Sequence, residues 1–153
     1  ISSAFNAAEK LTDLADQDAQ AVSALKDEQE RQELLALLGI REGERVSPSL
    51  RAQVRRLEEQ QKRRAKRVSS DTLLRSVAQV QTVLRDALTV ALSAQAPLVN
   101  EHLREPLEAF CTRRSAQQLL EDVQAVELTL RRLRTNANAR LALEALMSRF
   151  VYQ

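Results

Sequence analysis

Residues 115–150 read SAQQLLEDVQAVELTLRRLRTNANARLALEALMSRF, and this stretch predicts two consecutive helices. Ser115 is followed three residues later by Gln118, which is the spacing of a capping box at a helix N-terminus. Apolar residues then recur every three or four positions, as they do on one side of an amphipathic helix. They are Leu119, Val123, Val126, Leu130 and Leu133. The first helix of the pair therefore has one continuous apolar face.

The second helix of the pair is apolar on two opposite faces. Asn138 has a side chain suited to an N-cap, and the helix that it opens extends to Phe150 or Tyr152. The two faces consist of Leu143, Leu146 and Phe150, and of Leu141, Ala145 and Tyr152. In the preceding helix, Leu128 also lies opposite the main apolar face. A helix of this kind is either central in its own domain or shared with a neighbour. We predict that the second face and Leu128 contact another subunit.

The rest of the chain has the composition of a helical protein. Its 153 residues include two glycines and three prolines, too few for the turns of a sheet protein. Gly39 is placed to end a first helix that starts near residue 2, and Ser47-Pro48 is placed to open the next. Pro106 fits only the first turn of a short helix after a loop at residues 94–101. We predict an all-α helical bundle of about five helices with a long amino-terminal helical arm.

The first two helices are predicted to pair as a hairpin. The apolar stripe of the first is thin and made of small side chains, which allows a close approach. It comprises Ala8, Leu11, Ala15, Ala19, Val22 and Leu25. Residues 1–40 carry a net charge of −5 and residues 48–70 one of +6, so the two arms should attract each other. Ser69-Ser70 predicts a kink or break in the second helix.

The residues that usually perform chemistry are scarce. One histidine and one cysteine cannot supply the ligand set of a structural zinc site. His102 lies in a charged stretch and is interpreted as solvated, and Cys111 is interpreted as a half-buried small residue. Glycine occurs only at Gly39 and Gly43, so no phosphate-binding loop can be written. We predict no catalytic, cofactor-binding or metal-binding residue, no cofactor, and no enzymatic activity for this chain.

The sequence also bears on location. No apolar run approaches the roughly 20 residues that a membrane span needs, and no signal peptide is evident. A lone cysteine suits a reducing compartment. We therefore expect a cytoplasmic chain with no membrane partner. Because the sequence opens on Ile1, we also expect it to be a piece of a longer protein.

The sharpest charge feature is a basic run in the second helix. A possible nucleic-acid patch comprises Arg55, Lys62, Arg63, Arg64, Lys66 and Arg67. Glu58 precedes Lys62 by four residues and Glu59 precedes Arg63 by four, the favourable order for ion pairs on a solvated helix. No aromatic residue is interleaved for base stacking. We prefer the structural interpretation, with a basic nucleic-acid-binding module and a free-standing helical scaffold or homodimer as alternatives.

One segment resembles a known family. Residues 57–88, LEEQQKRRAKRVSSDTLLRSVAQVQTVLRDAL, are similar to the actinobacterial-type delta prime subunit of the bacterial DNA polymerase III clamp loader, in which a basic run precedes a helix with an RD-hydrophobic pattern. APLVN at residues 96–100 and LALEALMSRF at residues 141–150 resemble the closing part of delta prime proteins. In that family the region is the carboxy-terminal collar domain, which joins the clamp-loader subunits into a ring.

The resemblance implies partners rather than a substrate. Residues 1–46 would be a helical connector arm and loop, and residues 47–153 the collar domain that mediates oligomerisation. The partners would be the gamma or tau subunit and the delta subunit, with the sliding clamp and primed DNA reached only through the full complex. The ATPase module of this AAA+ family would lie upstream of the present residues. The chain would then take part in DNA replication without binding ATP itself.

Overall fold

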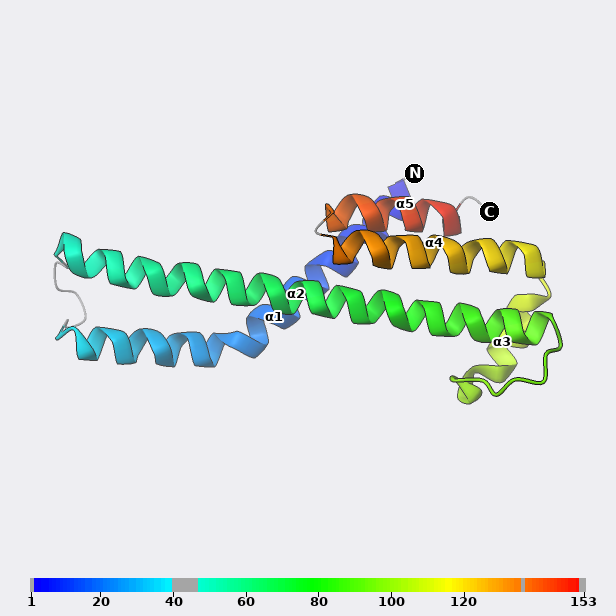
Figure 1. Ribbon diagram of the computed structural model, residues 1–153, viewed down its shortest axis with the longest axis horizontal. Coiled ribbons are helices and arrows are strands. Elements are labelled where there is room, and N and C mark those ends of the chain that lie inside the picture. Colours follow the sequence, from blue (N-terminus) through cyan, green and yellow to red (C-terminus); the bar gives the residue numbers. More distant parts are fainter. Residues whose placement is uncertain (1, 40–46, 136, 152–153) are drawn as a thin grey trace. The chain divides into compact units, whose positions relative to one another are not determined.

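The fold is all-α. The computed structural model describes residues 2–39, 47–135 and 137–151. The helices are α1 (Ser2–Leu37), α2 (Pro48–Ala91), α3 (Arg104–Cys111), α4 (Ala116–Arg134) and α5 (Ala139–Val151), and a short 3-10 turn, η1 (Glu101–Leu103), precedes α3 (Figure 1). No strand occurs within these described ranges. The predicted class and the predicted number of helices are confirmed.

Local chemistry sets the helix ends. Gly39 has a φ of +65°, the left-handed conformation that glycine adopts after a helix without a steric penalty. Ser115 Oγ accepts the backbone N–H of Gln118 at 3.2 Å, and Gln118 Oε1 accepts the backbone N–H of Ser115 at 2.9 Å. Asn138 Oδ1 accepts the N–H of Leu141 at 3.2 Å at the start of α5. The capping box and the two other predicted ends are confirmed.

The chain packs as two compact units. The bundle unit comprises Ile1–Thr12 and Leu73–Gln153, and the hairpin unit comprises Asp13–Thr72. Helices α1 and α2 each contribute one segment to each unit. The predicted division at residue 46 concerns the roles of the two parts of the chain, and it stays a prediction.

The hairpin unit is built on a face of α1 that differs in part from the predicted stripe. Ala15 and Ala19 are buried, as predicted, and Ser23 continues the buried face with an exposed fraction of 8%. Val22 and Leu25 are 77% and 81% exposed, so their placement on this stripe was wrong. The buried positions Ala15, Ala19 and Ser23 advance by four residues each time, as positions on one face of a helix do.

A charged network lies between the two arms of the hairpin. Arg64 Nη1 and Nη2 donate to the two carboxylate oxygens of Glu30 at 2.9 and 2.7 Å, and Arg64 also pairs with Asp27. Gln61 Nε2 donates to the backbone oxygen of Asp27 at 2.8 Å. The hydrogen bonds from Arg64 lower the pKa of Glu30 to about 2. The predicted attraction between the arms is confirmed, through a bidentate ion pair.

Helix α2 runs without interruption through Ser69 and Ser70, so the predicted break there was wrong. Ser69 is 7% exposed, and its hydroxyl donates a hydrogen bond to Asp16 Oδ1 on α1. A serine that is occupied across the hairpin does not compete with the hydrogen bonds of its own helix. Its small side chain also allows the two helices to approach closely.

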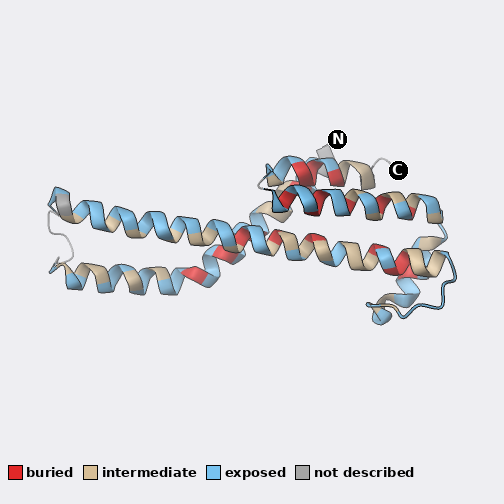
Figure 2. Ribbon diagram, in the orientation of Figure 1, coloured by how far each residue is buried: buried red, intermediate tan, exposed pale blue. Residues whose placement is uncertain are grey.

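The core of the bundle unit is apolar and draws on every helix of the fold. Its buried hydrophobic side chains are Ala8 on α1, Leu73, Val77, Leu84 and Ala87 on α2, Leu107 on α3, Leu119, Val126, Leu130 and Leu133 on α4, and Ala142, Leu143 and Leu146 on α5 (Figure 2). Burying each of these leucine or valine side chains stabilises the folded state by about 1.5–3 kcal/mol. Four of the five residues of the predicted inward stripe of α4 are buried, and the fifth, Val123, is half-buried.

Candidate interaction surfaces

The predicted contact residues that the structure describes lie at the surface of the bundle unit. Leu128 on α4 has an exposed fraction of 42%, and Leu141 on α5 one of 63%. Ala145 is also exposed, whereas Leu143 on the opposite side of α5 is completely buried. Tyr152 lies outside the described residues. The role of these side chains in binding another subunit stays a prediction.

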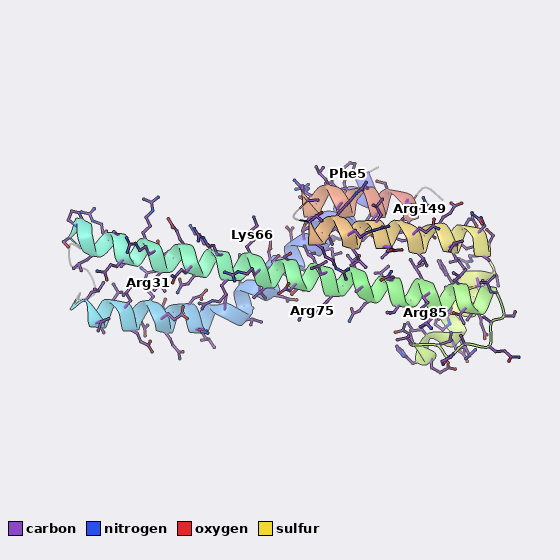
Figure 3. The ribbon with its side chains drawn as sticks, viewed as in Figure 1. Phe5, Arg31, Lys66, Arg75, Arg85 and Arg149 are labelled. Carbon is purple, nitrogen blue, oxygen red and sulfur yellow. The ribbon has the colours of Figure 1, made fainter. Side chains whose placement is uncertain are left out.

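Buried charge as well as apolar packing fixes α5 against α4. The carboxylate of Asp122 on α4 has no exposed surface, and it accepts a hydrogen bond from Arg149 Nε on α5 at 3.1 Å. It also pairs with Arg114, which precedes α4. Arg149, labelled in Figure 3, donates from Nη2 to Glu121 Oε2 at 2.8 Å. These contacts therefore fix which side of α5 packs against α4 and which side faces outward.

The start of α1 is tied to the start of α5 by a second ion pair. Arg140 Nη2 lies 3.3 Å from Glu9 Oε1, and Arg140 Nε donates to Glu144 Oε1 at 2.9 Å. Ala8 is completely buried beside this pair, and Phe5, labelled in Figure 3, is 40% exposed. Charged groups thus lie next to the exposed leucine of α5, as polar residues do at the rim of a protein interface.

Other exposed apolar side chains of the bundle unit were not singled out from the sequence. Leu120 on α4 is 40% exposed, and Leu92 directly after α2 and Val99 in the following loop are 60% and 59% exposed. Phe110 is 37% exposed, and the guanidinium of Arg114 lies 5.6 Å from the centre of its ring. The exposure of Leu120 could have been predicted, because it directly follows Leu119 and therefore lies off the inward stripe of α4.

A buried carboxylate that the sequence analysis did not assign holds the loop after α2. Asp86 has no exposed surface, and it accepts the N–H of Val99 at 3.0 Å, the N–H of Asn100 at 2.7 Å and Asn100 Nδ2 at 2.9 Å. Burial raises the pKa of Asp86, but these hydrogen bonds and the charge of Arg85 bring it below its ordinary value. Asp86 is therefore a structural anchor of the bundle unit.

The six basic residues of the possible nucleic-acid patch do not share one environment. Arg64 turns into the hairpin, towards Asp27 and Glu30. The other five are exposed on α2, and Figure 3 labels one of them, Lys66. They are Arg55, Lys62, Arg63, Lys66 and Arg67.

The ion pairs along α2 differ from the predicted ones. Glu59 Oε1 lies 3.5 Å from Arg55 Nε, four residues before it, rather than pairing with Arg63. In the described part of the hairpin unit, Glu58 and Lys62 do not form an ion pair either. The predicted i, i+4 pairs were therefore wrong, because Glu59 pairs towards the N-terminus of α2. In this part of the chain, neither Lys62 nor Arg63 forms an ion pair with a carboxylate.

The grooves along the hairpin are open and charged. The side chains around one groove, of about 560 Å³, are Arg31, Leu35, Arg51, Val54, Arg55, Glu58, Glu59 and Lys62. Only two of these residues are apolar, and the other six carry charges of both signs. Small-molecule sites are mostly apolar cavities with a few convergent polar groups. This groove does not have that character.

A known family matches most of the chain. The chain matches the family described as DNA polymerase III, delta subunit, C terminal, over residues 28–151. The chain belongs to this family. The match includes the end of α1 and all of α2 to α5, so it contains the basic segment of the hairpin unit and the α4–α5 pair. No curated protein and no solved structure matches the chain.

In this member of the family, the single cysteine is half-buried. The thiol of Cys111 donates to the backbone oxygen of Ala87 at 3.2 Å, and burial raises its pKa, which disfavours the reactive thiolate. His102 is exposed in η1. In the described ranges no three His, Cys, Asp or Glu side chains are grouped to hold a metal ion. None of the described helices is long and apolar enough to span a bilayer.

Proposed function

We propose that this chain is the collar domain of the delta prime subunit of a DNA polymerase III clamp loader. It would hold neighbouring subunits in a ring while the sliding clamp is loaded on primed DNA. Membership of a family of DNA polymerase III delta domains supports the clamp-loader assignment. The delta prime assignment rests on the similarity of residues 57–88 to delta prime proteins. By the same similarity, we expect a cytoplasmic, non-catalytic chain whose ATPase module lies upstream in the parent protein.

The observation that carries this proposal is the two-faced character of α5. Leu143 is completely buried on one side, and Leu141 is 63% exposed on the other, next to exposed Ala145. A single exposed leucine is ordinary on a protein surface. Exposed apolar residues on two consecutive helices, bordered by ion pairs that fix the helices in place, favour a partner surface. We assign the contact to Leu128, Leu141, Ala145 and Tyr152.

Replacing Leu141 with glutamate tests this surface. Leu141→Glu, alone and with Tyr152→Glu, should keep the helical circular dichroism of the chain because Leu141 is mostly exposed. Binding to immobilised gamma or tau subunit, or to delta, should weaken by at least about tenfold, the loss expected on charging an apolar contact. The matched control is Leu25→Glu, which introduces the same charge at a leucine 81% exposed on the hairpin unit.

A folded double variant that binds both subunits as tightly as the unmodified chain would disprove the assignment of these residues. An equal loss in Leu25→Glu would show that added negative charge, rather than the α5 face, causes the effect. If the unmodified chain binds neither subunit and instead forms a stable homodimer by its mass in solution, the free-standing scaffold is the better interpretation.

A competition measurement separates delta prime from delta. Each subunit occupies its own place in the ring, so a chain from delta prime should be displaced from gamma or tau by full-length delta prime and not by full-length delta. Displacement by delta alone would assign the chain to the delta position. The family match to a delta-subunit domain makes this second outcome the main alternative.

A further inference from the structure

We propose that the outward face of α2 between Arg56 and Arg67 binds the sugar-phosphate backbone of duplex DNA. This site goes beyond the proposed assembly function, because it lies in the hairpin unit and needs no other subunit. Its central residues, here named the basic face, are Arg56, Arg63, Lys66 and Arg67.

The basic face lies opposite the contact with α1. The side chains of α2 that turn towards α1 include half-buried Gln61 and Arg64 and buried Ser69, which bond to Asp27, Glu30 and Asp16. At 100° per residue, Arg63 and Lys66 point away from that direction, and both are exposed. From Arg56 to Arg67 the helix rises about 16 Å. The basic face is therefore a straight, solvent-facing row of cations.

The charge of this face is not neutralised within the hairpin unit. In its described part, none of the four cations of the basic face forms an ion pair. The nearest carboxylate on the same side of α2, Glu59, is paired with Arg55. On α1, Asp27 and Glu30 are occupied by Arg64, and Asp16 accepts from Ser69. The acidic arm thus neutralises the inward arginine and leaves the outward cations available to an external anion.

The composition around the basic face favours a polyphosphate over a protein. Protein interfaces have an apolar centre with aromatic or aliphatic anchors. Among the described residues from Pro48 to Gln79, no large hydrophobic side chain is exposed. Protein–DNA interfaces are instead polar and strongly positive, and arginine forks match phosphate oxygens. Three of the four cations here are arginines.

Two features favour duplex DNA over a single strand. No aromatic side chain is present on the hairpin between residues 13 and 72, so unpaired bases would have nothing to stack on. A duplex carries about one phosphate charge per 1.7 Å of its axis, which places about nine charges along a 16 Å row. Contacts to phosphates alone carry no base sequence, so the binding should be independent of sequence.

Salt dependence measures the number of phosphate contacts directly. The 153-residue chain is titrated into a fluorescent duplex of mixed sequence, and binding is followed by anisotropy from about 50 to about 200 mM salt. Four phosphate contacts predict a slope of log K against log salt of about −3.6, which is about a 150-fold loss over this range. The triple variant Arg63→Gln, Lys66→Gln, Arg67→Gln should retain a slope of about −0.9, so its affinity should fall only about 3.5-fold over the same range of salt.

The control variant removes the same charge from α1. Lys10, Lys26 and Arg31 are exposed on that helix, and replacing all three with glutamine should leave the slope unchanged. Circular dichroism checks that both variants keep their helices. Equal loss in the two variants would overturn the proposal, because binding would then follow net charge alone.

Two further measurements compare duplex DNA with other anionic ligands. Tighter binding to a single strand of the same length, or equal competition by polyglutamate, would also overturn the duplex assignment. So would the absence of binding at about 50 mM salt, where phosphate contacts are strongest. Because no other subunit is present in this assay, its failure leaves the collar proposal standing, and failure of the subunit-binding test leaves this one standing.

Discussion

Replacing Asp122 with asparagine tests whether buried charge holds α5 in position. Asp122 is completely buried on α4, where it accepts from Arg149 Nε at 3.1 Å and pairs with Arg114, which is 12% exposed. Asparagine has almost the same shape but carries no charge, and it presents a donor where one carboxylate oxygen was. The arginines would then face a neutral side chain inside the bundle unit.

The size of the effect follows from this arrangement. Each of the two charge-assisted hydrogen bonds is worth about 1.5–3 kcal/mol, and removing one partner of a buried ion pair costs about 3–5 kcal/mol. Arg149 retains its ion pair with Glu121 at 2.8 Å, and asparagine still accepts one hydrogen bond. Both contacts reduce the loss of stability. We expect Asp122→Asn to lower the free energy of unfolding of the bundle unit by about 3 kcal/mol.

Urea unfolding followed by circular dichroism at neutral pH measures this loss. The control is Glu127→Gln on the same helix, which breaks an ion pair with Arg131 at 3.7 Å whose side chains are 52% and 65% exposed. An exposed pair of this kind contributes about 0–1 kcal/mol. A loss in Asp122→Asn as small as that in Glu127→Gln would refute the structural role of the buried carboxylate. Amide hydrogen exchange along α5 should also be faster in Asp122→Asn.

Two other carboxylates give separate predictions. Asp86→Ala leaves the N–H groups of Val99 and Asn100 without their acceptor. Urea unfolding should then show a loss of about 2–4 kcal/mol in the free energy of unfolding of the bundle unit, and these two amides should exchange their hydrogens faster. Unchanged exchange would contradict the anchor role of Asp86. Glu30 has its pKa lowered to about 2 by the hydrogen bonds from Arg64, so its contribution to folding is complete above the ordinary glutamate pKa and is lost as the pH falls towards 2. The stability deficit of Glu30→Gln relative to the unmodified chain should therefore shrink between about pH 5 and pH 2, and a deficit independent of pH would disprove the pairing.

The helices and their ends could be predicted from the sequence because their signals are local. Gly39, the capping box at Ser115 and the cap at Asn138 each act on backbone groups a few residues away, so the residue types alone identify them. The inward stripe of α4 is similarly predictable, since its period is that of a single helix. The exposed positions of Leu128 and Leu141 follow from the same geometry.

The contacts between distant segments could not be predicted in this way. Val22 and Leu25 were expected inside the hairpin on apolar character alone, yet Ser23 is buried in their place. Asp27 and Glu30 look like ordinary solvated acids until Arg64, more than thirty residues away, is brought beside them. Ser69 was interpreted as an interruption because its partner, Asp16, lies on the other arm. For Asp27, Glu30 and Ser69, a long-range partner reversed the preference of the isolated residue.

The sequence by itself determined an all-α chain, most of the limits of its helices, and the lack of residues for familiar catalytic or metal sites. It also showed a resemblance to a DNA polymerase III subunit, which the family match supports at the level of a DNA polymerase III delta domain. Only the tertiary structure decided which charges are used internally and which face outward. It placed Arg64 in the hairpin and the basic face in solvent, and it enclosed Asp86 and Asp122 in the bundle unit. Helix formation depends on neighbours in sequence, whereas the environment of a charge depends on neighbours in space.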